Sequence, residues 1–182
     1  CDGAREGNEE EFKKVKKTRN ILKQNIDWDC EINWQVSDTN LGCKKGVSNA
    51  ISWFFKNVNE GIIIEDDIIA HKDFFEYCQN LLEKYRNDKR VWCISGTNNQ
   101  DEIIRGKGTY YFGKIPLIWG WATWKNRWEN FDINFSKWPE VKSSQILENI
   151  FTDDLQEQYW SKIFENSYEF SKPDTWDYAW VF

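Results

Sequence analysis

Residues 61–85 read GIIIEDDIIAHKDFFEYCQNLLEKY, where a short apolar run, an acidic triplet and a helical pattern follow one another directly. The run at 62–64 is β-branched and bounded by turn signals, which is typical of a strand buried on both faces. From Lys72 onward, apolar residues recur at three- and four-residue steps, as they do on the buried face of a helix. We therefore expect the triplet to lie at the carboxyl end of a buried strand.

The segments on either side of this stretch extend the same pattern. Residues 47–58 carry apolar side chains at helical spacing, and residues 91–95 form a second short apolar run that ends at Gly96. The order helix, strand, helix, strand favours parallel strands joined by crossover helices. The predicted fold class is therefore α/β, a Rossmann-like open sheet that is mostly parallel and flanked by helices.

The rest of the chain gives weaker signals. We expect an amphipathic helix at 8–24, strands at 31–36 and 109–112, helical turns at 121–128, and helices at 143–151 and 153–168. Since there is no internal repeat or linker, we predict a single domain over residues 1–182. Its two ends stop in mid-pattern, so we interpret it as truncated at both ends.

Composition excludes several classes of protein. The formal net charge is −6, from 30 acidic and 24 basic residues, whereas a nucleic-acid-binding domain is normally basic. No apolar stretch approaches the roughly 20 residues that a transmembrane helix needs. The five cysteines are odd in number and lack CxxC spacing, and there is one histidine, so we expect neither a disulfide framework nor a zinc site. We predict a cytoplasmic location, because such cysteines fit a reducing compartment.

Glu65, Asp66 and Asp67 are the strongest candidates for chemistry. Open α/β sheets bind ligands at the carboxyl ends of their strands, and three carboxylates in a dry place require water or a cation. Hard oxygen ligands suit Mg²⁺ or Mn²⁺, which commonly bridge one or two carboxylates to substrate phosphates. The alternative is that Asp66 or Asp67 only caps the following helix or faces solvent.

The order of several motifs adds a family resemblance that covers nearly the whole chain. The matching segments are CDGARE at 1–6, NLGCKKGVSNAISWFF at 40–55, the stretch at 61–85, VWCISGTN at 91–98, WGWATW at 119–124 and DTWDYAW at 174–180. Together they resemble glycosyltransferases of the GT-A fold, especially N-acetylglucosaminyltransferases with a Glu-Asp-Asp motif and bacterial nucleotide-diphospho-sugar transferases. The first strand of that family is absent here, and a further family histidine or acidic residue would lie beyond residue 182.

The resemblance implies roles for the triplet and for the WGWATW segment. Asp67 would bind Mn²⁺ or Mg²⁺ directly, while Glu65 and Asp66 would contact the ribose or the donor sugar. Gly120 would let the chain turn sharply and present Trp121 to a sugar ring. The competing interpretation is that the tryptophans of this segment only pack in the core, which we favour for the later ones.

The same resemblance implies a nucleotide contact near the start of the chain. Asp2 would lie near the base, Gly3 would permit close approach of the backbone, and Arg5 would reach the diphosphate. The alternative for the Asp-Gly pair is an ordinary tight turn, and the alternative for the arginine is simple solvation.

Transfer of a sugar also needs a base that takes a proton from the acceptor hydroxyl. We assign this role to Asp177 first and to Asp174 second, because both lie in the late acidic-aromatic segment. The alternative for Asp174 is helix N-capping. His71 is a lesser candidate as a metal ligand or base, and a surface histidine at the start of a helix is the favoured interpretation.

The resemblance thus implies an enzyme, a metal-assisted glycosyltransferase that moves a sugar from a nucleotide diphosphate donor to a glycan or glycoconjugate acceptor. The setting would be polysaccharide synthesis on the cytoplasmic side, and peripheral association with a membrane stays open. One alternative is a metal-dependent phosphohydrolase, although such sites usually recruit further Asp or His ligands. The other is a non-catalytic sugar- or nucleotide-binding module, whose binding would survive EDTA and Asp67→Ala.

Overall fold

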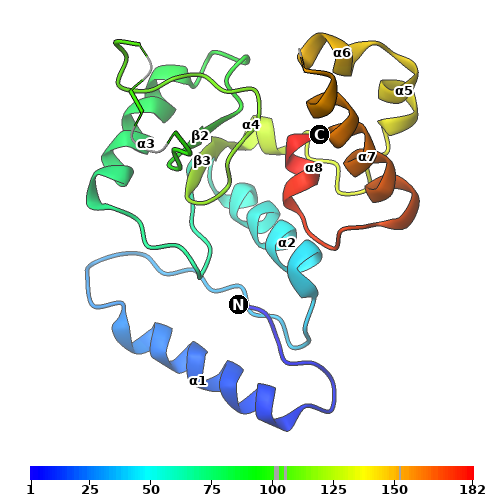
Figure 1. Ribbon diagram of the computed structural model, residues 1–182. Coiled ribbons are helices and arrows are strands. Elements are labelled where there is room, and N and C mark those ends of the chain that lie inside the picture. Colours follow the sequence, from blue (N-terminus) through cyan, green and yellow to red (C-terminus); the bar gives the residue numbers. More distant parts are fainter. Residues whose placement is uncertain (101–102, 105, 152) are drawn as a thin grey trace. The chain divides into compact units, whose positions relative to one another are not determined.

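The computed structural model describes residues 1–100, 103–104, 106–151 and 153–182. It divides into two compact units, Cys1–Trp53 and Phe54–Phe182, whose elements are drawn in Figure 1. Helix α2 (Gly42–Asn57) runs across the boundary between them. Within the described residues, no helix combines the length and apolar character that crossing a membrane requires.

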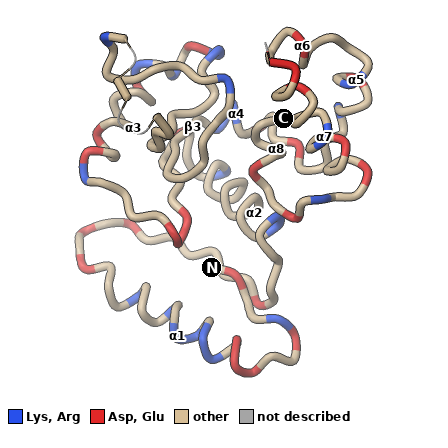
Figure 2. The backbone as a smooth tube through the Cα atoms, viewed as in Figure 1, with Lys and Arg blue, Asp and Glu red and all other residues tan. Residues whose placement is uncertain are grey.

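The first unit contains α1 (Glu9–Asn25), which confirms the helix predicted at 8–24. The Asn8 side chain accepts a hydrogen bond from the Glu11 backbone amide at 3.0 Å and so caps the helix. Acidic residues occupy the first turn, where the helix dipole favours negative charge, and basic residues follow (Figure 2). The strand predicted at 31–36 is wrong, because the backbone there is irregular and its apolar side chains are largely exposed.

The second unit is built on a small sheet. Strands β1 (Glu60–Ile63), β3 (Trp121–Trp124) and β2 (Cys93–Ser95) lie in that order, and β3 is antiparallel to both neighbours. Helix α3 (Lys72–Tyr85) has its predicted start and packs Cys78, Leu81 and Leu82 into a core with Ala122 of the sheet. That core positions the loops that follow β1 and β2.

The predicted fold class is wrong. The described residues are 47% helical and their sheet is small and antiparallel, rather than a mostly parallel open sheet. Strands β1 and β2 do run in the same direction, but β3 lies between them and pairs with both. Residues 121–128 were expected to form helical turns. Instead Trp121–Trp124 form a strand buried along its whole length, and only Lys125–Trp128 form a helical turn, α4.

The C-terminal part of the second unit is helical. It consists of α5 (Trp138–Ser143), α6 (Ile146–Ile150), α7 (Asp154–Phe170) and α8 (Asp177–Val181). The helix predicted at 153–168 is confirmed, whereas the one predicted at 143–151 is shorter than expected and corresponds to α6, since only its first residue belongs to α5. The strand predicted at 109–112 is wrong, because these residues form a loop.

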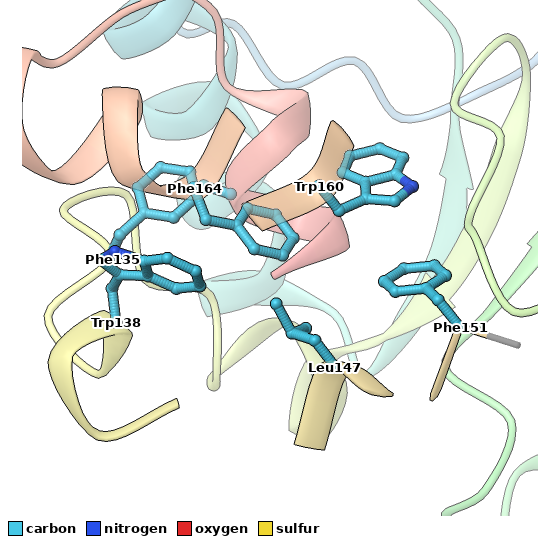
Figure 3. Close-up of a cluster of buried hydrophobic side chains, with 7 residues drawn as sticks. Phe135, Trp138, Leu147, Phe151, Trp160 and Phe164 are labelled. Carbon is cyan, nitrogen blue, oxygen red and sulfur yellow. The ribbon is translucent and has the colours of Figure 1, made fainter. Parts of the chain in front are cut away.

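A second core holds these helices together. Aromatic side chains dominate it, and Figure 3 shows Phe135, Trp138, Phe151, Trp160 and Phe164 turned toward one another around Leu147. Ring contacts such as the one between Trp138 and Phe164, with centroids 5.7 Å apart, are edge-to-face. Tryptophan is thus used here chiefly for packing.

Candidate functional site

The acidic triplet forms a tight turn directly after β1. The Ile68 backbone amide donates to the Glu65 carbonyl at 3.2 Å, which leaves Asp66 and Asp67 at the two central positions of the turn. Both aspartates are exposed, and Glu65 is half-buried. Asp66 and Asp67 are thus open to a ligand.

Sheet register brings the triplet to the same edge as the loop after β2. Ile63 of β1 and Ser95 of β2 both pair with Trp121, so the chain leaves the sheet at one edge on both sides of β3. Gly120 enters β3 at this edge, and its carbonyl accepts a hydrogen bond from the Gly96 amide at 2.8 Å. Gly120 has a φ of +73°, a left-handed conformation that favours glycine.

The late acidic-aromatic segment meets the triplet at this edge. The Glu65 carboxylate accepts a hydrogen bond from the indole of Trp176, which lowers its pKa, but the net pKa is raised. Burial is the largest cause of the rise, followed by the negative charges of Asp67, Asp177 and Asp66. Charge from the C-terminal segment therefore acts on the triplet, although the two lie far apart in the sequence.

The two aspartates of this segment are held differently. Asp177 is half-buried at the start of α8, and its carboxylate accepts a hydrogen bond from the Thr175 hydroxyl. Asp174 is exposed. Because α8 begins after Trp176 and has no side-chain cap, Asp174 does not cap it. Asp177 is thus the better positioned of the two predicted bases.

The predicted sugar contact at Trp121 meets a different environment. Its side chain is 0% exposed and stacks on Trp176, with ring centroids 5.8 Å apart, so it presents no free ring face in this structure. Two residues earlier, Trp119 is 61% exposed at the same sheet edge. Nothing in the residue pattern distinguishes Trp119 from Trp121, because the exposure of each tryptophan depends on where β3 begins.

The predicted nucleotide contacts near the start of the chain lie in the first unit. The Asp2 carboxylate accepts a hydrogen bond from the Leu41 amide at 2.9 Å, next to the start of α2. A Cβ on Gly3 would lie 2.5 Å from the Thr39 backbone, so the glycine permits close approach of the chain to itself. Arg5 is paired with Glu11 at 3.3 Å. A role for these residues at a nucleotide stays a prediction.

His71 has a structural role at the start of α3. Its side chain accepts a hydrogen bond from the Asp73 amide at 3.3 Å and caps the helix. The imidazole is largely exposed and lies 3.4 Å from the Asp73 carboxylate. This agrees with the interpretation of a surface histidine at a helix start.

The triplet differs from a closed metal cage. Among residues 1–100, 103–104, 106–151 and 153–182, no group of three or more His, Cys, Asp or Glu side chains is arranged to hold a metal ion. The carboxylates whose charges raise the pKa of Glu65 nevertheless include both aspartates of the turn and Asp177 at the start of α8. This fits a cation that binds one or two carboxylates and completes its coordination with water and ligand phosphates, as Mg²⁺ commonly does.

A cleft of about 650 Å³ begins next to this edge. Its walls come from α3, from β2 and the residues that follow it, from the loop at 109–117 and from the last residues of the chain. Aromatic side chains line much of it, and its polar members include Ser95, Thr97 and Asn98 as well as the charged residues Asp73, Arg90 and Lys114. A cleft of this size, mostly apolar with a few polar groups, is typical of small-molecule sites.

Comparison with known proteins gives no assignment. No protein-family model matches the chain, and no solved structure matches it.

Proposed function

We propose that the chain is a metal-assisted glycosyltransferase, which moves a sugar from a nucleotide diphosphate donor to a glycan or glycoconjugate acceptor. One observation carries the proposal: the Glu65 carboxylate of the triplet accepts a hydrogen bond from Trp176, the residue before Asp177, so the late segment and the triplet meet at one place. Metal-assisted sugar transfer can use one carboxylate to bind the cation and a second one as the base that takes the proton from the acceptor hydroxyl. The resemblance of the triplet and of the late segment to transferase motifs supports the same assignment.

In this proposal each carboxylate of the triplet has its own role. Asp67 would hold Mn²⁺ or Mg²⁺, which as a Lewis acid would supply charge stabilisation for the departing diphosphate. Glu65 and Asp66 accept hydrogen bonds from hydroxyl groups of the ribose or the donor sugar. Trp176 orients Glu65 through its indole N–H.

Asp177 is the proposed base. It takes the proton from the acceptor hydroxyl as the new glycosidic bond forms to that oxygen and the bond between the sugar and the diphosphate breaks. The Thr175 hydroxyl, which donates to Asp177, fixes the direction of its carboxylate. The cytoplasmic setting that we propose fits an odd count of scattered cysteines.

A phosphohydrolase is the weaker alternative. Two-metal hydrolases usually hold their ions with several Asp or His ligands, and the sequence contains a single histidine. Release of inorganic phosphate from simple phosphoesters, without sugar transfer, would favour it. A non-catalytic module would instead bind its ligand equally well in EDTA.

Calorimetric titration with UDP and GDP, with and without Mn²⁺, tests the proposed function. We expect one of the two nucleotides to bind in Mn²⁺, and Asp67→Asn or EDTA to weaken that binding about tenfold or more, since about 1.4 kcal/mol corresponds to tenfold. Asp154→Asn removes an equally exposed carboxylate from the first turn of α7 and should leave binding unchanged. Binding that is equally tight in EDTA and in Asp67→Asn, or no binding of either nucleotide, would contradict the proposal.

A further inference from the structure

Trp119 is the exposed aromatic side chain that lies nearest in sequence to the turn into β3. Single exposed hydrophobic residues are common on protein surfaces, so the 61% exposure of Trp119 carries no argument alone. Its position does, because it immediately precedes Gly120 at the edge where the triplet leaves β1. The neighbouring Trp121 is fully buried, so the two tryptophans that flank Gly120 have opposite environments.

The backbone at Trp119 is held firmly. The Thr97 hydroxyl donates to the Trp119 carbonyl at 2.8 Å. The next carbonyl, that of Gly120, accepts from the Gly96 amide at 2.8 Å. Both bonds tie the residue to the loop after β2, so its ring projects from a fixed position instead of a free loop.

The chemistry of this position suits a sugar ring. An indole offers a flat apolar face, and the pyranose face that carries axial C–H groups is apolar as well. Thr97, which holds Trp119, also lines the cleft of about 650 Å³ beside β2, together with Tyr77 and Tyr111. Hydroxyl and amide groups such as that of Asn98 supply partners for sugar hydroxyls.

Trp119 lies close to the acidic triplet. It precedes β3, which pairs directly with β1, and neighbouring strands lie about 4.8 Å apart. A Cβ at Gly120 would lie 3.6 Å from the side chain of Ile68, the last residue of the triplet's turn. An acceptor sugar on Trp119 would therefore lie beside a donor sugar held at the triplet.

We infer that Trp119 is the platform on which the acceptor sugar stacks, with the rest of the glycan extending into the cleft beside Thr97. This inference rests on the proposed function, because it names the acceptor side of the same site.

Binding of the full chain to an array of defined bacterial and eukaryotic oligosaccharides, without nucleotide, tests this inference. The tightest glycan is then titrated against Trp119→Ala, Trp119→Phe and the control Trp28→Ala, which removes a tryptophan that is 63% exposed in the first unit. We expect Trp119→Ala to weaken glycan binding about tenfold or more and Trp119→Phe to retain most of it, because a phenyl ring keeps a stacking face. Trp28→Ala should bind as the wild type does.

Two further measurements make the outcome decisive. Urea unfolding of Trp119→Ala should match the wild type, because the side chain is exposed, and its Mn²⁺-dependent UDP or GDP binding should be unchanged. If the wild type binds no glycan on the array, or Trp119→Ala binds as tightly as the wild type, the platform is overturned. If glycan binding depends on Trp119 but no nucleotide binds, the platform stands as a sugar site and the transferase proposal fails.

Discussion

At the scale of single residues, Glu65 shows how the site works against the stability of the fold. Burial and three neighbouring carboxylates disfavour its ionised form, and the hydrogen bond from Trp176 compensates only in part. A carboxyl group in such a place gains most from a nearby cation, which removes the repulsion. The loss in free energy of unfolding that ionised Glu65 causes when no cation is bound is therefore measurable.

Replacing Glu65 by glutamine should stabilise the protein at alkaline pH. A carboxyl group whose pKa is higher in the folded than in the unfolded state binds more protons when folded. The free energy of unfolding therefore falls as pH rises from the unfolded-state pKa through the folded-state pKa. We expect Glu65→Gln to have a higher urea midpoint than the wild type at pH 8, and the difference to vanish once Glu65 is protonated in both states, near pH 3.

Glu60 provides the matched control for this measurement. It is hydrogen-bonded to Arg86 at 2.8 Å, and this bond is the main cause of its lowered pKa. Glu60→Gln should therefore lower the urea midpoint at pH 8, which is the opposite sign. A difference between Glu65→Gln and the wild type that is the same at pH 8 and pH 3 would contradict our account of Glu65.

Arg127 is the residue that holds the turn between α3 and β2. Its guanidinium is almost fully buried and donates to the backbone carbonyls of Tyr85, Arg86, Asp88 and Val91. Arg127→Met should destabilise the protein by about 3 kcal/mol or more, because buried carbonyls lose their donors. Urea denaturation measures this loss, and Arg5→Met, at an arginine whose side chain is 73% exposed, should change the midpoint little. Equal effects of the two substitutions would count against this role.

At the scale of elements, the sequence predicts helices better than strand pairing. The apolar periodicity of α3 and α7 is local, so it can be detected without knowing the rest of the fold. Strand β3 could not be found this way, since the run WATW has no alternation and is buried throughout. Its partners β1 and β2 are distant in sequence, so tertiary packing, and not the local sequence, determines whether they pair with each other or with β3.

The candidate site, too, could be predicted from the sequence only in part. The acidic triplet and the late segment could be singled out from residue types and their order. The exposure of Trp119 and the burial of Trp121 could not, because they depend on the register of β3 against Ile63 and Ser95.

A substitution at Gly96 tests how closely α3 and the start of β3 pack around the residue that follows β2. A Cβ at this position would lie 2.4 Å from the ring of Phe74 in α3 and 3.0 Å from the Gly120 carbonyl. Gly96→Ala should therefore destabilise the protein by about 1–3 kcal/mol, as overpacking usually does. Gly113→Ala is the control, because its nearest contact would be 3.9 Å away. Chemical denaturation of both variants makes the comparison, and a neutral Gly96→Ala would show that α3 can move away from this edge.

At the scale of the whole molecule, α8 and the residues around it belong to two clusters of the second unit. Trp180 packs on Trp121 and Trp128, with ring centroids 5.3 and 5.2 Å apart, next to the sheet. Ala179 is buried in the helical core of Figure 3, and Phe182 packs against Phe164 of that core. The C-terminal segment thus connects the sheet to α5–α7.

A chain shortened to residues 1–172 should lose cooperative folding. Deleting a buried tryptophan side chain costs about 3–5 kcal/mol, and the removed segment contains both Trp176 and Trp180. Two such losses are comparable with the 5–15 kcal/mol that stabilises a typical domain. We expect broad urea unfolding by tryptophan fluorescence, and binding of the dye ANS to the exposed clusters.

Phe170→Ala, which removes a ring that is 67% exposed at the end of α7, should leave the transition sharp. If the shortened chain unfolds at the midpoint of the full chain, the sheet and the helical core are each stable alone, and the triplet would then have to function without Trp176 and Asp177.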